Sequence, residues 1–168
     1  LSGRHINAIV NIDYDTGKLN WILGDPEGWS DERKRYLFTP VGDGEFDWQY
    51  EQHACVITPD GDVMCFDNGH YRSCDPEKYI LNRDNFSRGV RYRINTDDMT
   101  IQQVWQYGKE LGQHFFSKYI CNVEYYGENH YMIHSGGIQY QGENAMEGFA
   151  VLAADDPTIR SKSITVEV

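Results

Sequence analysis

Residues 21–29 read Trp21-Ile22-Leu23-Gly24-Asp25-Pro26-Glu27-Gly28-Trp29. This stretch follows an alternating run, Ile6 to Leu23, in which apolar and polar residues take turns as they do in two β-strands. It is too apolar at its ends, and too rich in Gly and Pro in its middle, to be a plain turn. Strands that lead into a patterned loop flanked by Trp indicate a repeating all-β protein with one elaborated loop.

The composition fits a single β-rich domain. The chain has 168 residues, enough for one core, and its 14% aromatic content with 12 Tyr favours strands over helices. The formal net charge of −11 argues against nucleic acid or an anionic membrane as a partner. No apolar run approaches the roughly 20 residues that span a bilayer, and no signal peptide is visible.

Both ends look like cuts through a longer polypeptide. Leu1-Ser2 resembles the end of a strand, and the chain stops within the alternating run from Ser163 to Val168. We expect any targeting information to lie outside these residues, so the compartment, cytoplasmic or periplasmic, stays open.

Strand-like segments recur along the whole chain, separated by turn residues. They cover residues 6–12, 18–23, 53–58, 63–66, 90–95, 100–106, 121–125, 131–134, 149–153 and 161–168. Two strands around an acidic Gly turn, a variable loop, and two strands around an Asp-rich turn form one unit. This unit repeats at about 50 residues, a spacing typical of β-propeller blades.

The repeat predicts a propeller in which residues 53–107 form one blade and residues 119–168 the next. Residues 1–24 would end a preceding blade, and residues 25–52 would be a loop insertion. About two and a half four-stranded blades cannot close a ring, so we expect the remainder of the propeller from the same or a partner chain. A β-sandwich is the competing architecture, although its loops are rarely this long at regular positions.

The four cysteines, Cys55, Cys65, Cys74 and Cys121, lack the spacing of a metal site. Cys55 and Cys65 flank a hairpin turn. A two-residue turn would put their sulfur atoms on opposite faces, whereas a three-residue turn would place them opposite each other. Cross-strand disulfides are uncommon, so we expect reduced thiols.

Three polar residues fall near the expected central channel. His53 opens the first strand of one blade, and Arg72 lies just beyond the second strand of that blade. His134 ends the second strand of the next blade, before Gly136-Gly137, which allows a close backbone approach. Because neighbouring blades bring equivalent strand ends together, we expect the three side chains to converge on one small volume.

This set suits the transfer of an anionic group. A neutral imidazole, with a usual pKa of about 6.5, is a competent nucleophile at neutral pH. Arg72 offers a fixed fork of donors to a tetrahedral oxyanion. A second histidine can hold charge or pass a proton to the leaving oxygen.

Plainer interpretations apply to each residue alone. A single His on a strand is usually a packing or surface residue, and Asp67-Asn68-Gly69 can be only a turn. Arg72 can pair with Asp75 or Glu77 for under about 1 kcal/mol. The remaining histidines show no metal spacing; they are His5, His70, His114 and His130. The residues alone therefore support a propeller with a His and Arg anion site.

Three motifs, taken with their order and spacing, resemble the bacterial arylsulfate sulfotransferase family. They are WILGDPEGW at residues 21–29, Gln52-His53-Ala54, and Phe66-Asp67-Asn68-Gly69-x-x-Arg72, with a lead-in from Gly3 to Ile9. The resemblance runs over most of the chain and fades after about Gln141.

The resemblance implies a six-bladed propeller that needs no cofactor or metal and passes a sulfuryl group from an aryl sulfate, through a histidine, to a phenol. It assigns charge and proton handling to His53, and the grip on the sulfate to Arg72 with Asn68. His134, one blade later, is the predicted nucleophile, and His114 is the alternative. Whether the protein forms a homodimer stays open. The expected partners are a small-molecule aryl sulfate and a phenol.

The chain departs from the family pattern in two ways. A further site histidine of the family lies upstream of Arg4, outside this chain. Some members carry two cysteines joined as a disulfide shortly before the nucleophile, whereas only Cys121 occupies that region here. Because the second cysteine is missing, the protein need not depend on a disulfide, and a cytoplasmic location stays as possible as a periplasmic one.

Two other functions compete with sulfuryl transfer. A non-catalytic propeller would bind an anionic or aromatic ligand, or a protein, without reacting. A hydrolytic sulfatase would release sulfate to water. In sulfuryl transfer, the aromatic side chains of Trp29, Phe115 and Tyr119 would hold the aryl ring near the mouth of the channel, or they would simply pack between blades.

Overall fold

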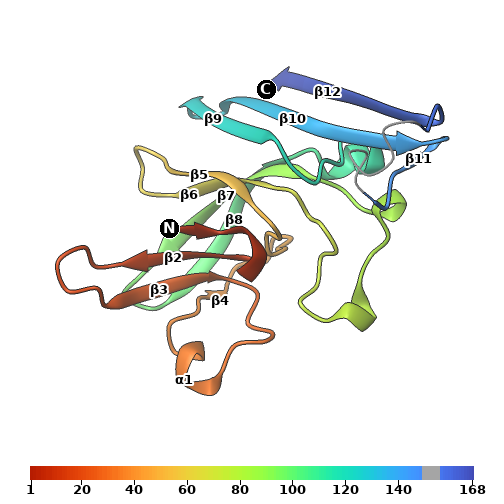
Figure 1. Ribbon diagram of the computed structural model, residues 1–168. Coiled ribbons are helices and arrows are strands. Elements are labelled where there is room, and N and C mark those ends of the chain that lie inside the picture. The colour runs from red at the N-terminus through yellow and green to blue at the C-terminus, as the bar shows by residue number, and fades with distance from the viewer. Residues whose placement is uncertain (149–155) are drawn as a thin grey trace.

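The computed structural model describes residues 1–148 and 156–168, and its fold is all-β, as predicted. Three sheets lie one above another in the order of the sequence (Figure 1). Within the described residues, no helix has the length and apolar character needed to cross a membrane.

The first sheet is built from the N-terminal residues. It contains β1 (Ser2–Gly3), β2 (Ala8–Ile12) and β3 (Leu19–Gly24), paired antiparallel in that order. The prediction that a strand begins at Ile6 is wrong, because η1 (Arg4–Ile6) forms a 3-10 turn there. Asn7 ends that turn with a left-handed φ of 51°, a conformation that Asn tolerates well.

The second sheet is a four-stranded meander with one added strand. Its order is β4-β8-β7-β6-β5. The strands are β5 (His53–Ile57), β6 (Val63–Asp67), β7 (Arg88–Asn95), β8 (Thr100–Tyr107) and the short β4 (Thr39–Pro40). The segment expected as a loop insertion, residues 25–52, therefore contributes β4, which pairs parallel with β8, and a short helix α1 (Asp31–Lys34).

The third sheet extends beyond the predicted strands. β9 (Cys121–Gly127) and β12 (Ile159–Glu167) flank β10 (His130–Gln141), and β11 (Asn144–Ala145) pairs with the end of β10. The strand predicted at residues 149–153 lies outside the described residues. The loop between β6 and β7 contains η2 (Pro76–Lys78) and η3 (Asn82–Asp84), and η4 (Lys109–His114) connects the second sheet to the third.

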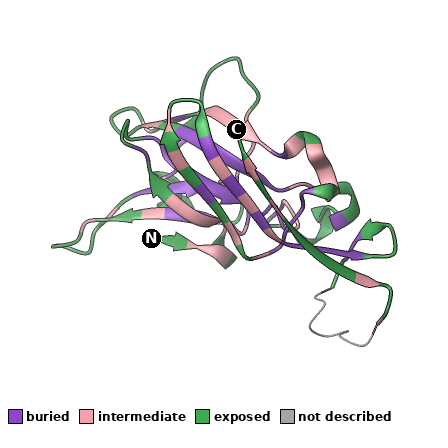
Figure 2. Cartoon of the chain, turned by 90° about the horizontal axis from the view of Figure 1, so that it is seen from above, coloured by how far each residue is buried: buried purple, intermediate pink, exposed green. Residues whose placement is uncertain are grey.

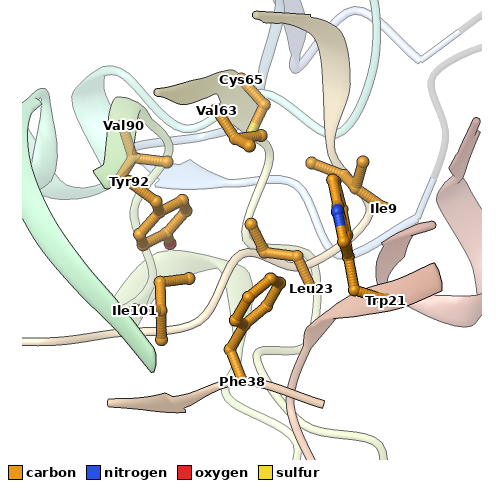
Figure 3. Close-up of a cluster of buried hydrophobic side chains, with 9 residues drawn as sticks. All are labelled: Ile9, Trp21, Leu23, Phe38, Val63, Cys65, Val90, Tyr92 and Ile101. Carbon is orange, nitrogen blue, oxygen red and sulfur yellow. The ribbon is translucent and has the colours of Figure 1, made fainter. Parts of the chain in front are cut away.

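Two apolar layers hold the three sheets together. The layer between the first and second sheets is drawn in Figure 3 and consists of Ile9, Trp21, Leu23, Phe38, Val63, Cys65, Val90, Tyr92 and Ile101. The layer between the second and third sheets consists of Met64, Phe66, Phe115, Val123, Tyr131 and Ile133. Strand alternation supplies both layers, since Val63 and Cys65 face one side of β6 while Met64 and Phe66 face the other. Figure 2 shows the buried residues gathered in the central strands, with the turns exposed.

The hairpin that carries two of the cysteines has the three-residue form. Thr58 donates its backbone N–H to the Asp62 carbonyl at 2.9 Å, which leaves three residues in the turn. Val56 pairs with Met64, so Cys55 lies across from Cys65, beside a bulge in β5. All four cysteines are free thiols, as expected.

Each sheet buries one face against the next, as blades of a propeller would. None of the three sheets closes on itself within the described part of the chain. The all-β class is therefore observed, while the ring of blades remains a prediction.

Candidate functional site

His53 is held by two hydrogen-bond acceptors at the start of β5. Its Nδ1 atom lies 2.7 Å from Oδ1 of Asn68 and 3.1 Å from the carbonyl oxygen of Glu51. Since both partners accept, the proton resides on Nδ1 and the lone pair on Nε2. With Nδ1 engaged in this way, Nε2 is the ring nitrogen through which His53 can act as a base or nucleophile.

Asn68 follows β6 directly and is fully buried. Its Nδ2 donates to the Ser117 carbonyl at 2.7 Å and to Sγ of Cys121 at 3.3 Å. These two acceptors fix the orientation of the amide, so that Oδ1 must face His53. The sequence predicted Asn68 as a substrate-binding residue, and this stays a prediction. In the structure the Asn68 amide contacts His53, the Ser117 carbonyl and Cys121.

Arg72 belongs to the loop that follows β6, and 7% of its side chain is exposed. Its Nη2 donates to Oδ2 of Asp67 and to the Phe86 carbonyl, both at 3.0 Å, and its Nε donates to Oδ1 of Asn85 at 3.1 Å. The guanidinium carbon stands 3.5 Å from the centre of the Phe86 ring. Nη1 makes only a 3.5 Å contact with the Trp48 carbonyl, so it is the least occupied nitrogen.

A buried carboxylate joins Arg72 to a second arginine. Oδ2 of Asp67 accepts from Nε of Arg88 at 2.9 Å as well as from Arg72, and Oδ1 accepts from the Tyr50 N–H at 2.9 Å. Asp67 and the Arg88 side chain are fully buried. Burial lowers the pKa of Arg72, and the negative charge of Asp67 opposes that shift. Asp67 is the carboxylate that both arginines share, and Asp47 adds a second one 3.8 Å from Nη1 of Arg88, so the buried positive charges are paired.

Sequence reasoning missed the part played by Asp67 and Arg88. Asp67 was interpreted as a turn residue, and Arg88 belongs to none of the motifs. Arg88 was the available signal, because it lies at the start of β7, a central strand. A long charged side chain is buried in such a strand only when it is paired, so Arg88 called for an acidic partner.

His134 occupies a different surface. On β10 its neighbours Ile133 and Ser135 are fully buried toward the second sheet, so strand alternation points His134 to the opposite face. Its Nδ1 lies 2.8 Å from Oγ1 of Thr165 on β12. Among the hydrogen bonds and ion pairs of the described residues, none joins His134 to His53 or Arg72.

Two glycines after His134 let the backbone of β10 approach the preceding loop. A Cβ at Gly136 would lie 1.9 Å from the Ile120 carbonyl oxygen and 2.9 Å from Nε2 of His134. A Cβ at Gly137 would lie 2.6 Å from the Tyr119 carbonyl oxygen. The close approach expected from the sequence is therefore present, at a shift in register between Ser135 and Ile138.

The other sequence candidates lie apart from this region. His114, the alternative nucleophile, ends η4 and places Nδ1 at 3.3 Å from the Tyr140 hydroxyl. Phe115 is fully buried between the second and third sheets, so it packs rather than holds a ligand. No group of three or more His, Cys, Asp or Glu among the described residues is placed to hold a metal ion.

Comparison with known proteins gives one consistent result. The family model described as Arylsulfotransferase (ASST) matches residues 1–167. A protein named arylsulfate sulfotransferase AssT from Escherichia coli O6:H1 is 34% identical over 152 residues, 82% of this chain and 25% of that protein. One of the same name from Lelliottia amnigena is 35% identical over 140 residues, 74% of this chain and 23% of that protein. The chain spans about a quarter of the length of these curated relatives.

Proposed function

The chain belongs to the arylsulfotransferase family, and on that basis we propose that the protein transfers a sulfuryl group from an aryl sulfate ester to a phenolic acceptor. The reaction proceeds in two halves through a sulfohistidine. The remainder of the protein completes a β-propeller whose channel holds the site.

The first half-reaction loads the histidine. Nε2 of His134 attacks the sulfur atom, the bond from sulfur to the aryl oxygen breaks, and the phenolate leaves with the electron pair. Thr165 fits this role when its hydroxyl accepts from Nδ1–H, because the lone pair then lies on Nε2. A phenolate is a good leaving group, which suits a weak nucleophile such as imidazole.

The second half-reaction returns the histidine to its starting state. The acceptor hydroxyl gives its proton to Nε2 of His53, its oxygen attacks sulfur, and the bond between sulfur and His134 breaks. The proton on His53 then passes to the departed phenolate or to water. One observation supports the proposal most directly. Nδ1 of His53 faces two acceptors, Oδ1 of Asn68 and the carbonyl of Glu51, and this leaves Nε2 as the basic atom.

Cationic hydrogen-bond donors would supply much of the rate enhancement by stabilising the transition state. Sulfuryl transfer resembles phosphoryl transfer in its loose transition state, whose charge is spread over the equatorial oxygens. In the proposal Arg72 meets that charge through Nη1, while Asp67 and Asn85 hold the other guanidinium nitrogens in place. The convergence of His134 with His53 and Arg72 is part of the proposal.

Intact-mass measurement of the full-length protein tests the reaction. With 4-nitrophenyl sulfate and no acceptor, the protein should gain about 80 Da as SO₃, and His134→Ala should gain none. Adding a phenol should remove the extra mass. His114→Ala is the matched control and should load normally.

Two other results would replace the proposal. A binding module would retain its ligand in His134→Ala and gain no mass. A sulfatase would release nitrophenol and free sulfate without any acceptor. Loading that survives His134→Ala but fails in His114→Ala would move the nucleophile to His114.

A further inference from the structure

Two of the four thiols lie on facing strands. Cys55 belongs to β5 and Cys65 to β6, the two strands of the hairpin that carries His53. Cys65 is fully buried in the layer between the first and second sheets (Figure 3), and Cys55 is partly exposed and packs against the same layer. Both side chains therefore point to the same side of the hairpin, where their sulfur atoms can meet.

A bulge in β5 sets the two cysteines opposite each other. The two residues that follow His53, Ala54 and Cys55, together face Cys65 of β6, and Ala54 has a left-handed φ of 51°. Residues opposite one another on antiparallel strands have Cα atoms about 4.5–5.5 Å apart, inside the range of about 4.4–6.8 Å that a disulfide spans. The pairing of β5 with β6 thus suits a disulfide between the two cysteines.

The two thiols differ in reactivity. A hydrogen bond from the Cys65 thiol lowers the pKa of Cys55, although burial opposes that shift. The same hydrogen bond and full burial raise the pKa of Cys65. Cys55 also lines a cavity of 310 Å³ beside β1 and β2. Because the thiolate is the nucleophile in thiol chemistry, Cys55 is the residue that reacts first.

The other two cysteines have different neighbours. Sγ of Cys74 accepts from Nδ2 of Asn7 at 3.7 Å. Sγ of Cys121 lies 3.2 Å from Oγ of Ser117 and 3.3 Å from Nδ2 of Asn68. Among the residues that the structure describes, only the hairpin pair consists of cysteines opposed on adjacent strands.

We propose that Cys55 and Cys65 form a reversible disulfide that fixes the bulge after His53. The structure shows the reduced state of this pair. In the first step the Cys55 thiolate attacks one sulfur atom of a small disulfide, and one small thiolate leaves. The sulfur of Cys65 then attacks Sγ of Cys55, and the small thiolate that leaves takes up the proton that Cys65 loses. Two electrons thus pass from the protein to the small disulfide, which becomes two thiols.

The disulfide acts on the strand that carries His53. In the described part of the chain β5 is the last strand in the order of the second sheet, so its backbone pairs with β6 alone. Bulges aim the side chains beside them, and a covalent bond between Cys55 and Cys65 prevents this bulge from opening. The inference goes beyond the proposed function, because it holds whether or not the protein transfers a sulfuryl group.

Peptide mapping of the full-length protein tests the inference. The folded protein is incubated with oxidised glutathione, free thiols are blocked with iodoacetamide, and the chain is cleaved before Asp60 and Asp62, which lie between the two cysteines. We expect a linked pair of peptides that joins Cys55 to Cys65 and is lighter by about 2 Da than the two reduced peptides together. Excess reduced glutathione should break the link.

Cys55→Ser is the main variant, because this side chain is partly exposed and its replacement should leave the fold intact. It should form no link to Cys65, whereas Cys74→Ser and Cys121→Ser should form the link normally. Amide hydrogen exchange tests the effect on the bulge. Oxidation should slow the exchange of residues 54–57 at least about threefold in the unsubstituted protein and leave it unchanged in Cys55→Ser.

Four outcomes overturn the inference. They are four free thiols after oxidation, a stable mixed disulfide at Cys55 without a link to Cys65, a link that forms only in denaturant, and a link that leaves exchange in β5 unchanged. The gain of mass with 4-nitrophenyl sulfate judges the proposed function separately, since neither cysteine takes part in that reaction.

Discussion

The loop after β6 and the outer face of the third sheet, the face on which His134 lies, differ in how many contacts their polar side chains make within this chain. In the loop, Asn68 and Arg72 are engaged by neighbours from several segments, and Asp67 is fully buried. On the outer face, His134 has one side-chain hydrogen bond, to Thr165 on the adjacent strand. The loop is built like an interior, whereas the outer face is built like a surface that another sheet could cover.

One residue connects the two regions. Ser117 accepts from Asn68 through its carbonyl oxygen, and its Oγ accepts from the Gly137 N–H at 2.7 Å. The segment around Ser117 therefore contacts both Asn68, which holds His53, and the irregular part of β10 that follows His134. Ser117 therefore joins the two regions, although no hydrogen bond among the described residues connects His134 to His53 or Arg72.

Removing Asp67 should have the largest effect on the loop. Asp67→Ala leaves Arg72 without its ion-pair partner and leaves Arg88 with only the longer, 3.8 Å ion pair to Asp47, so we expect a loss of about 3–5 kcal/mol in the free energy of unfolding. Denaturant titration measures it. Asp97→Ala, in an exposed turn, should change stability by no more than about 0.5 kcal/mol. A loss of similar size in both variants would contradict the idea of an interior built around Asp67.

A side chain at Gly136 should disturb the outer region next most. The added Cβ meets the backbone carbonyl of Ile120, which cannot rotate away, so Gly136→Ala should cost near the upper end of about 1–3 kcal/mol. It should also displace His134 and reduce loading. Gly127→Ala is the matched control, since nothing lies within 4 Å of a Cβ there. Equal thermal stability of the two variants would show that the close approach does not matter.

Asn68→Ala should have a smaller effect, of about 1–2 kcal/mol, because the Ser117 carbonyl keeps the Ser87 hydroxyl as a donor and loses only the Asn68 amide. The more specific readout is the tautomer of His53. With the Asn68 acceptor gone, ¹⁵N chemical shifts should show His53 moving from the Nδ1–H form toward a mixture of tautomers. An unchanged ¹⁵N pattern would mean that the Glu51 carbonyl alone sets the tautomer.

The smallest effect concerns Lys118, which follows the connecting serine. Burial lowers the pKa of its ammonium to about 8, although the charge of Glu147 opposes the shift. Between that pKa and the ordinary Lys pKa of about 10.4, the unfolded chain binds more protons than the folded one. Stability relative to Lys118→Met should therefore rise as the pH increases from 8 to 10. A flat difference across that range would place Lys118 in a more solvated setting.

The strand order could be predicted because alternation and turn residues act locally. The hairpin from His53 to Asp67 and the hairpin from Arg88 to Tyr107 lie close to their predicted positions. The strand from Tyr131 to His134 was expected to be short, yet β10 continues to Gln141. Its continuation passes through two glycines, and periodicity carries no signal for a bulge that depends on a neighbouring loop.

The candidate site was predictable in part for the same reason. His53, Asn68 and Arg72 could be selected from short motifs, but their partners could not. The Ser117 carbonyl is 49 residues from Asn68, and the carbonyl that accepts from Arg88 belongs to Asp47 at a separation of 41. Such contacts depend on how loops fold over one another rather than on local pattern.

Amino-acid pattern alone was enough for the all-β class, the hairpins and the polar residues worth testing, because side-chain alternation and turn preferences operate over a few neighbouring positions. Packing decided the rest. It buried Arg72 against Asp67, turned His134 to the outer face, and gathered the nonapeptide and the loop after β6 around one cavity. These outcomes arise from contacts between distant segments, and burial of charge and apolar surface selects among them only once the whole chain is folded.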